Sequence, residues 1–267
     1  MKIRTILLVI VALCVLSGEA RAQFLLEEGK VSLAVSGGDR ITKSLWIDNI
    51  TGESVAVRVY WEDFQYQPPY DGTKLFLPAA TGQRTASLWV DFTPKEFTLP
   101  PYGKQEVSYT ISLPGQIQGG YYGVLFFEKV TQPLKSNSAV DVITRVGCLF
   151  FLETKDSNRK AAIQDLKMSG NIVSGNFLNQ GNVVLIPQMT YNIMDDGGMV
   201  TDRGKIKALY LPPAATAPWE VDLSGDLNSG HYTLIINSDL GEGDVVVKEI
   251  EFVKEASGGL TIKSVRD

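Results

Sequence analysis

The sequence predicts an all-β protein made of two consecutive immunoglobulin-like β-sandwich domains. Apolar and polar residues alternate along many short segments rich in Val, Ile, Tyr and Trp, which is typical of half-buried strands. Helical spacing is absent from residues 24–61. Turn residues interrupt the strand-like segments at regular intervals, about seven strands per half, and this spacing favours a sandwich over a barrel.

Residues 1–22 are predicted to be a cleaved signal peptide. Lys2 and Arg4 precede an apolar run that is short for a membrane span, and Ala20-Arg21-Ala22 forms a cleavage site before Gln23. We therefore expect an exported protein of the periplasm or cell surface, with no transmembrane segment in the mature chain. The net charge of −5 makes nucleic acid an improbable class of partner.

In the first half, strands are expected at 31–35, 41–47 and 55–61. A corner marked by Pro100-Pro101 then leads into strands 105–113 and 121–127, which the intervening Pro and Gly residues predict to be a hairpin-like antiparallel pair. The half ends with VDVITRVGCLFFLE at 140–153, expected to be the longest strand.

A polar, charged segment without apolar periodicity, TKDSNRK at 154–160, is predicted to be a linker. It divides a first sandwich at 23–153 from a second at 161–254, whose segments again read as strands. The last residues, 255–267, are expected to form a flexible tail.

Two motifs recur in both halves. Asn49-Ile50-Thr51-Gly52 is echoed by Asn179-Gln180-Gly181-Asn182. A Leu-Pro-Pro corner followed by a Gly-x-Tyr segment also occurs twice, from Leu99 and from Leu211. The repetition predicts one corner-plus-hairpin unit used twice, and therefore a duplicated sandwich.

The sequence offers no catalytic machinery, cofactor motif or metal-ligand run. His231 is the single histidine, which leaves a standard triad or a histidine-clustered zinc site without parts. Cys148 lies in an apolar strand and is predicted to be a buried, inert thiol. The acidic residues of SDLGEGD at 238–244 are better explained as a solvated turn than as a calcium loop. The chain is therefore predicted not to be an enzyme.

An aromatic, proline-marked segment at 64–84 is expected to be a loop. Tyr66, Tyr70 and Phe76 either pack over the end of the sandwich or form part of a contact surface for a partner. Packing is the favoured interpretation, and the contact surface is the alternative.

The strand at 140–153 is apolar on both faces, and its second face carries Ile143, Leu149 and Phe151 with Arg145. One interpretation is a strand covered twice, the second time by the second domain. The other is an edge that pairs with a strand of another protein, which would contact these four side chains.

The first half resembles the amino-terminal domain of periplasmic pilus-assembly chaperones. The likeness rests on the strand pair around Asn49, on FTPKEFTLPPYGKQEVSYTI and on TRVGCLFFLE. The stretch GQIQGGYYGVLFF is also similar to the paired sandwich domains of WxL-interacting cell-surface proteins. The chaperone resemblance implies a last strand that pairs with a client, and an Arg and a Lys that anchor the client's terminal carboxylate. Here the first strand offers Lys30, while Gly147 takes the Lys position and Arg145 lies two residues earlier.

These features predict a non-catalytic, exported protein-binding module that assists the assembly of fimbrial or surface subunits by edge-strand pairing. The alternative is a structural or adhesive cell-surface protein that binds peptidoglycan or a surface partner through the aromatic segment.

Overall fold

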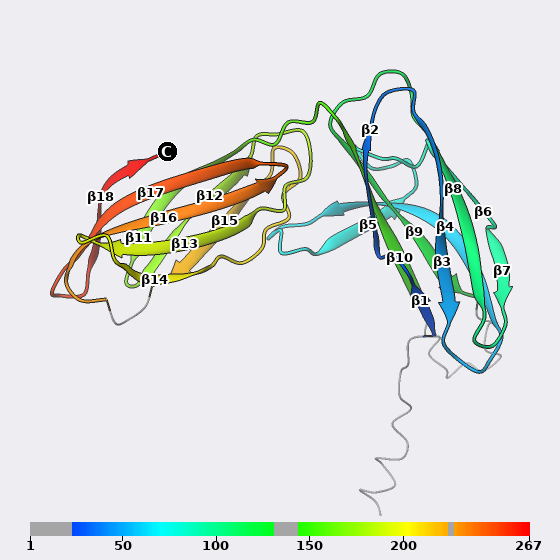
Figure 1. Cartoon of the computed structure of the whole chain (residues 1–267), viewed down its shortest axis with the longest axis horizontal. Helices are drawn as coiled ribbons and strands as arrows, with labels where there is room; N and C mark the ends of the chain where they lie inside the picture. The colour runs from blue at the N-terminus through cyan, green and yellow to red at the C-terminus, as the bar shows by residue number, and fades with distance from the viewer. Residues whose placement is uncertain (1–22, 131–143, 224–226) are drawn as a thin grey trace, which may run out of the picture.

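The computed structural model describes residues 23–130, 144–223 and 227–267, which form 18 strands in two connected halves (Figure 1). The predicted signal peptide lies outside the described residues. Nowhere in the described ranges is there a helix with the length and apolar character needed to cross a membrane.

The first half contains two facing sheets. Its strands are β1 (Phe24–Leu26), β2 (Lys30–Val35), β3 (Arg40–Asn49), β4 (Val55–Tyr66), β5 (Lys74–Pro78), β6 (Val90–Thr93), β7 (Glu96–Leu99), β8 (Lys104–Ser112), β9 (Gly120–Lys129) and β10 (Arg145–Thr154). One sheet has the order β1-β3-β8-β6, and the other has the order β2-β10-β9-β4-β5 with β7 also paired to β4.

Strand alternation explains how these sheets enclose a core. In β4, Val55, Val57, Val59 and Trp61 face inward and are buried, as the period of two predicts. They pack against apolar residues of the facing sheet, including Leu45 of β3 and Ile111 of β8.

The segments 105–113 and 121–127 are strands, but the prediction that they pair as a hairpin is wrong. β8 pairs with β3 and β6, whereas β9 pairs with β4 and β10 in the other sheet. The Pro and Gly residues between them carry the chain across the sandwich because both strands bury one face in the same core, from opposite sides.

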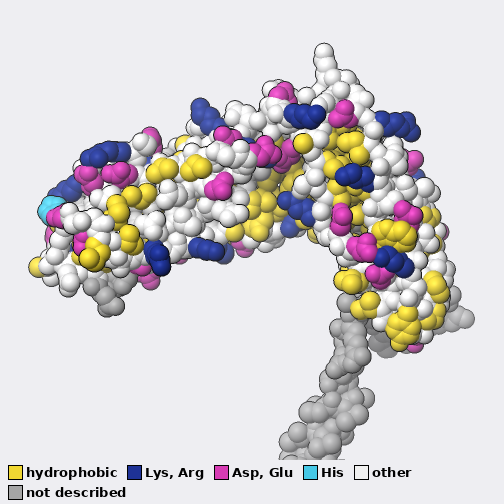
Figure 2. All heavy atoms as spheres, viewed as in Figure 1, with side chains coloured by type: hydrophobic (Ala, Val, Ile, Leu, Met, Phe, Trp, Pro, Cys, Tyr) yellow, Lys and Arg dark blue, Asp and Glu magenta, His cyan; other side chains and the backbone are white. Residues whose placement is uncertain are grey.

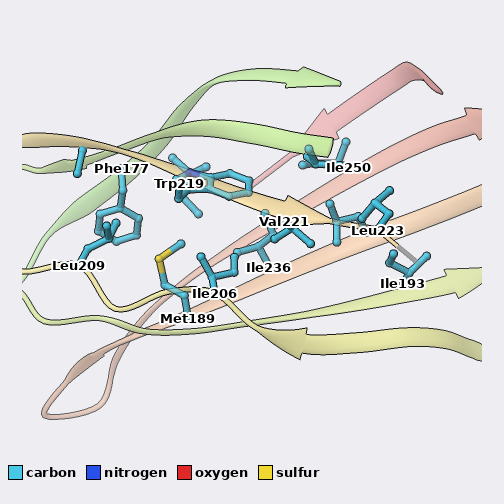
Figure 3. Packing of buried hydrophobic residues seen from close by; sticks show 14 of the residues in the cluster. Phe177, Met189, Ile193, Ile206, Leu209, Trp219, Val221, Leu223, Ile236 and Ile250 are labelled. Atoms are coloured by element: carbon cyan, nitrogen blue, oxygen red, sulfur yellow. The ribbon is translucent and has the colours of Figure 1, made fainter. Parts of the chain in front are cut away.

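The second half repeats this two-sheet plan. Its strands are β11 (Ala161–Ser169), β12 (Ile172–Asn179), β13 (Gln188–Asp195), β14 (Val200–Lys205), β15 (Thr216–Asp222), β16 (Gly230–Gly241), β17 (Asp244–Lys254) and β18 (Leu260–Arg266). The sheets have the orders β11-β12-β15 and β14-β13-β16-β17-β18. Figure 3 shows Trp219, Phe177 and Ile236 pointing into the space between them.

The expectation of a flexible tail at 255–267 is wrong. β18 pairs antiparallel with β17 from Glu249 to Lys254, and Leu260 and Ile262 pack against the core of the second half. The turn at Glu255 and Gly258 brings the chain back to the sheet. The tail is therefore the edge strand of the five-stranded sheet.

Two buried asparagines show that the repeated motif builds the same corner twice. Asn49 donates from Nδ2 to the carbonyls of Glu53 (2.7 Å) and Pro100 (2.9 Å), and its Oδ1 accepts from the Thr51 N–H. Asn179 donates from Nδ2 to the carbonyls of Val183 and Leu211, both at 2.8 Å, and its Oδ1 accepts from the Gly181 N–H. In each half the asparagine ties one turn to the Leu-Pro-Pro corner.

The two halves meet through specific contacts. The Val184 N–H donates to the Tyr122 hydroxyl (2.6 Å), and the Gly120 N–H donates to the Asn182 carbonyl (3.1 Å). Asn182 and Asn158 are joined by hydrogen bonds in both directions. Figure 1 shows the junction at the bend of the molecule.

Candidate protein-binding surface

The outer face of the six-stranded sheet carries most of the residues predicted to bind a partner. On β10, even-numbered residues such as Cys148 and Phe150 face the core of the first half, so Arg145, Leu149 and Phe151 face outward. Lys30 of β2 lies beside Leu149, and its ammonium group is 4.3 Å from the centre of the Phe151 ring. Figure 2 shows hydrophobic and positively charged side chains gathered along the inner side of the bend.

β10 has one open stretch of edge among the described residues. It pairs with β9 from Arg145 to Glu153, but β2 pairs with it only from Leu149 to Thr154. The predicted strand 140–153 is described only from Arg145 as strand, and Ile143 lies outside the described residues. Four residues, 145–148, therefore have no strand partner on the side of β2 among the described residues.

The backbone direction at this edge follows from two hydrogen bonds. The Leu149 N–H donates to the Gly29 carbonyl on the β2 side, whereas the Thr144 carbonyl accepts from Lys129 on the β9 side. Since the backbone groups alternate along a strand, Arg145 and Gly147 direct their N–H and C=O groups to the open side. These groups are those a partner strand would need.

Phe151 is not exposed in the structure, so the prediction that it contacts a partner strand from an open face is wrong. Phe151 is only 5% exposed. Its ring lies 5.3 Å from that of Tyr122 and 5.8 Å from that of Phe64, in a cluster that Val184 of the second half joins. Leu149 is partly buried against the same cluster. The outer face is apolar at this point because the second half covers it.

Arg145 is already paired within the chain. Its Nη1 donates to Glu62 Oε1 and to the Tyr60 hydroxyl, both at 3.1 Å, and its guanidinium stacks 4.0 Å from the Phe126 ring centre. Tyr60 donates in turn to Glu128 (2.7 Å). Burial, followed by this hydrogen bond, raises the pKa of the Tyr60 hydroxyl. Arg145 therefore does not offer a free charge to a carboxylate.

Lys30 borders a hollow of about 430 Å³ that sequence reasoning missed. The hollow is lined by residues of β2, the end of β10, the following linker and the β16–β17 turn, among them Lys155, Arg159, Glu153 and Glu242. Arg159 forms ion pairs with Glu153 and, at 3.3 Å, with Glu242. Lys155 is exposed. The charged segment 154–160 was the sequence signal for this hollow, but the linker interpretation treated the segment only as a spacer.

The aromatic segment 64–84 is not a loop throughout. β4 continues to Tyr66, and β5 returns beside it, so the segment is a hairpin that Figure 1 shows reaching toward the second half. Tyr66 is 5% exposed, with its ring 5.1 Å from that of Tyr210, and the Tyr70 carbonyl accepts from the Tyr210 N–H (2.8 Å). Burial raises the pKa of Tyr66 strongly.

The predicted contact surface of three rings is therefore wrong for Tyr66 and Tyr70. Tyr66 is buried, and Tyr70 is partly buried against both apolar clusters at the junction. Phe76 lies apart from them, 36% exposed, with its ring 5.1 Å from Phe126. The favoured interpretation, that the segment packs, is the one the structure supports.

The remaining candidates for chemistry have structural roles. Cys148 is fully buried, and burial, followed by the charge of Glu28, raises the pKa of its thiol to about 12. In the acidic turn at 238–244, Glu242 forms an ion pair with Arg159, and the Asp239 carboxylate accepts a hydrogen bond from the Gly241 N–H. Within the described ranges no group of His, Cys, Asp and Glu is arranged to hold a metal ion.

No protein family model matches the chain. No curated protein matches it either. Solved structures do resemble it. A chain from a chaperone and tip-adhesin complex of CFA/I fimbriae biogenesis has a TM-score of 0.52 at 12% identity, over 85% of this chain and 97% of that chain. The class 5 fimbriae chaperone CfaA has a TM-score of 0.50 at 13% identity, over 84% of this chain and 97% of that chain.

The similarity confirms the predicted fold class and the chaperone-like character of the fold, whereas the likeness to WxL-interacting proteins stays a prediction. It covers both sandwiches. The chain is an all-β protein with the paired immunoglobulin-like sandwich fold of fimbrial assembly chaperones.

Proposed function

We propose that the chain is an exported, non-catalytic chaperone-like protein that binds a subunit of a surface fibre. A strand of the subunit adds to the open edge of β10. The single observation that carries this proposal is the four-residue stretch 145–148, which is paired with β9 and has no partner on its other side among the described residues. One of the structures with this fold comes from a complex of a chaperone with a tip adhesin.

The open edge of β10 offers backbone N–H and C=O groups that no strand of the described residues pairs with. Gly147 directs its backbone groups outward, and a Cβ added there would meet Phe126 and Val124 side-chain atoms at 2.8 Å. The glycine therefore lets β10 lie close to the side chains of β9. Strand addition uses main-chain bonds for affinity and needs an edge of this kind.

Lys30, rather than Arg145, is the cation that can meet a client carboxylate. Arg145 is held by Glu62 and Tyr60, whereas Lys30 has no ion pair among the described residues and borders the hollow with Lys155. A client strand paired with 145–148 would end beside the start of β2, where Lys30 lies opposite Leu149. The predicted pair of Lys30 and Arg145 is thus reduced to Lys30 in the proposal.

The edge is tested by two substitutions at one position. Arg145→Ala and Arg145→Pro both remove the guanidinium and its ion pair, but only proline also removes the outward N–H. The first position of a strand tolerates proline, so both variants should fold. The probe is a synthetic peptide of alternating valine and threonine, about ten residues long to match a strand.

Fluorescence anisotropy of the labelled peptide should show binding to the wild type and to Arg145→Ala, and a loss of about tenfold for Arg145→Pro, the value of one main-chain hydrogen bond. Equal affinity of the two variants would contradict pairing at this edge. Amidation of the peptide's carboxyl end should weaken binding to the wild type and leave binding to a Lys30→Gln variant unchanged. An equal loss in both proteins would contradict the role of Lys30.

A further inference from the structure

A cavity of about 400 Å³ lies where the β4–β5 hairpin meets the second half of the molecule (Figure 1). The end of β4, residues 63–66, lines one side of it, and residues 82–85 line another. Val184 and the corner 212–215 border it from the second half. Concave sites of this volume between two domains are common places for ligands to bind.

The sheet opens at this cavity because β4 loses its neighbour. β4 pairs with β9 only as far as Glu62, which lies opposite Val124. Continuing that register would place Phe64 opposite Tyr122. Instead, the main-chain N–H and C=O groups of Tyr122 bond to residues 84–86, at 2.8 and 3.2 Å. This segment therefore takes the place of β4 beside the start of β9.

Hydrogen bonds near both ends of β4 fix the direction of its main chain. The Ala56 carbonyl accepts from the N–H of Val130, the residue just after β9 (2.9 Å). The Gln67 N–H donates to the Thr73 carbonyl on the β5 side (3.0 Å). Since the backbone groups alternate along a strand, the even-numbered residues of β4 face β9 and the odd-numbered residues face β5.

Phe64 and Tyr66 therefore direct their main-chain N–H and C=O groups toward the cavity. No strand of the described residues pairs with them on this side, and no hydrogen bond from another described residue reaches these four groups. Both residues are buried, with exposed fractions of 8% and 5%. Because buried main-chain groups normally have partners, these four identify the cavity as a place for a hydrogen-bonding ligand.

We propose that the cavity binds a short extended segment of a peptide, which pairs with β4 at Phe64 and Tyr66. The unpaired groups of these two residues repeat after about 7 Å along the strand. An extended peptide has the same repeat, and three of its residues can form all four hydrogen bonds. A sugar ring carries hydroxyl groups around its rim and does not repeat an amide at this spacing.

The lining of the cavity favours an uncharged segment. The Asp63 carboxylate is 1% exposed and already accepts from two main-chain N–H groups and from the Thr85 hydroxyl (2.6 Å). Arg84 donates to the carbonyls of Gln118 and Gly120, at 3.2 and 3.4 Å. Both charged residues of the lining are therefore engaged within the chain. The site lies on the other side of β9 from the open edge of β10 and does not depend on binding there.

Two peptides of equal composition test the pairing. The reference probe is acetyl-Thr-Val-Thr N-methylamide. One derivative is N-methylated on both threonines, which leaves one edge of the extended peptide free. The other is N-methylated on the first threonine and the valine, which obstructs both edges. The reference and the first derivative should bind with a Kd of about 1 mM, as expected for four main-chain hydrogen bonds, and the second about tenfold more weakly or worse. Equal affinities of the two derivatives would contradict strand pairing.

Amide NMR spectra of the protein locate the bound probe. The N–H signals of Phe64 and Tyr66 should move downfield on binding, whereas that of Gln65, whose N–H faces β5, should move little. The signals of Arg145 and Gly147 report on the edge of β10, so either proposal can fail alone. Shifts confined to those two residues would overturn the cavity site. A response at Phe64 to N-acetylglucosamine but not to the peptide would overturn it too, in favour of a carbohydrate site.

A disulfide trap gives an independent readout. Gln83 is exposed and lines the cavity, whereas Leu88 is 76% exposed and does not line it. A Thr-Val-Thr peptide extended by a cysteine should crosslink to Gln83→Cys under reversible thiol exchange in much higher yield than to Leu88→Cys. An excess of the reference probe should remove the difference. The native Cys148 is fully buried and should give no background. Equal yields for the two variants would contradict binding in the cavity.

Discussion

Asn49 and Asn179 form the same three hydrogen bonds in the two halves, but their corners have different surroundings. The Asn49 corner lies away from the junction, beside the exposed Tyr102. The Asn179 corner continues through Gly181 into Asn182, which bonds to Asn158 of the linker and to Gly120 across the junction. The duplicated unit therefore keeps the residue that fixes its corner, and in the second half it also uses the turn that follows to hold the first half.

The Gly-x-Tyr segments show the same division. Tyr122 at the start of β9 accepts from the Val184 N–H and joins the apolar cluster between the halves. Tyr232 at the start of β16 donates to the Asn228 carbonyl and stacks on Phe252 within its own half. The difference shows that corresponding positions of a repeat diverge where one copy meets the other.

The largest effect that tests this comparison is expected at the asparagines. Asn179→Ala removes three hydrogen bonds from a fully buried site. It leaves the Val183 carbonyl and the Gly181 N–H without these partners, while the Leu211 carbonyl keeps its bond from Leu185, and it should cost roughly 2 to 4 kcal/mol. Asn49→Ala should lower the stability of the first half by a similar amount. Calorimetry of both variants checks this. If either asparagine can be replaced at a cost below about 1 kcal/mol, its corner is not held as described.

A smaller effect is expected at the tyrosines. Tyr122→Phe leaves the Val184 N–H without its acceptor at the junction and should cost about 1 to 2 kcal/mol. Tyr232→Phe frees only a carbonyl of a partly buried bond and should cost less than about 1 kcal/mol. Denaturant unfolding of the two variants compares them. A reversed order would show that the junction contact contributes little.

Cys148 allows unfolding of the first half to be followed separately, because the sequence after residue 160 contains no cysteine. The raised pKa of its thiol, about 12, leaves almost no thiolate at pH 8, and the side chain is fully buried. An aromatic disulfide reagent should therefore react only when the first half opens. The rate should rise with the first unfolding transition, and rapid reaction of the native chain would contradict the described burial.

Proteolytic cleavage of the linker is expected to have the smallest effect, because each sandwich stays folded. We predict that the cut falls within 154–160 and leaves two stable pieces of about 130 and 100 residues, the usual size of such sandwiches. Mass spectrometry of the fragments identifies the site. A single resistant core that spans the linker would show that the contacts of Asn158 and Arg159 protect the segment.

Much of the fold could be predicted from sequence because its signals are local. The alternation in β4 and the repeated Asn and Leu-Pro-Pro motifs identified strands and corners correctly. Which sheet a strand joins is decided by distant partners, so the pairing of β8 with β3 could not be seen in the Pro and Gly residues that follow it. The tail was misjudged because β18 alternates only weakly and depends on β17 for pairing.

The candidate site was predicted less well than the fold. Apolar residues on both faces of β10 fit a covered strand and an open edge equally, and the structure has both, at Phe151 and at Arg145–Cys148 respectively. Arg145 was taken as a free cation because Glu62 and Tyr60, more than eighty residues earlier, give no sign in sequence that they hold it. The hollow beside Lys30 depends on Glu242 from the far half.

The junction also has a mechanical consequence. Three separate segments of the second half make attachments across the junction. Val184 bonds to Tyr122, Tyr210 bonds to Tyr70 at the tip of the β4–β5 hairpin, and Glu242 pairs with Arg159 of the linker, which also pairs with Glu153 of β10. Two domains that are joined by one linker alone can rotate freely about it. Here any rotation of one half against the other must break at least one of three attachments. The junction should therefore be rigid, and its three attachments should break together. A force applied to one sandwich is then transmitted to the other.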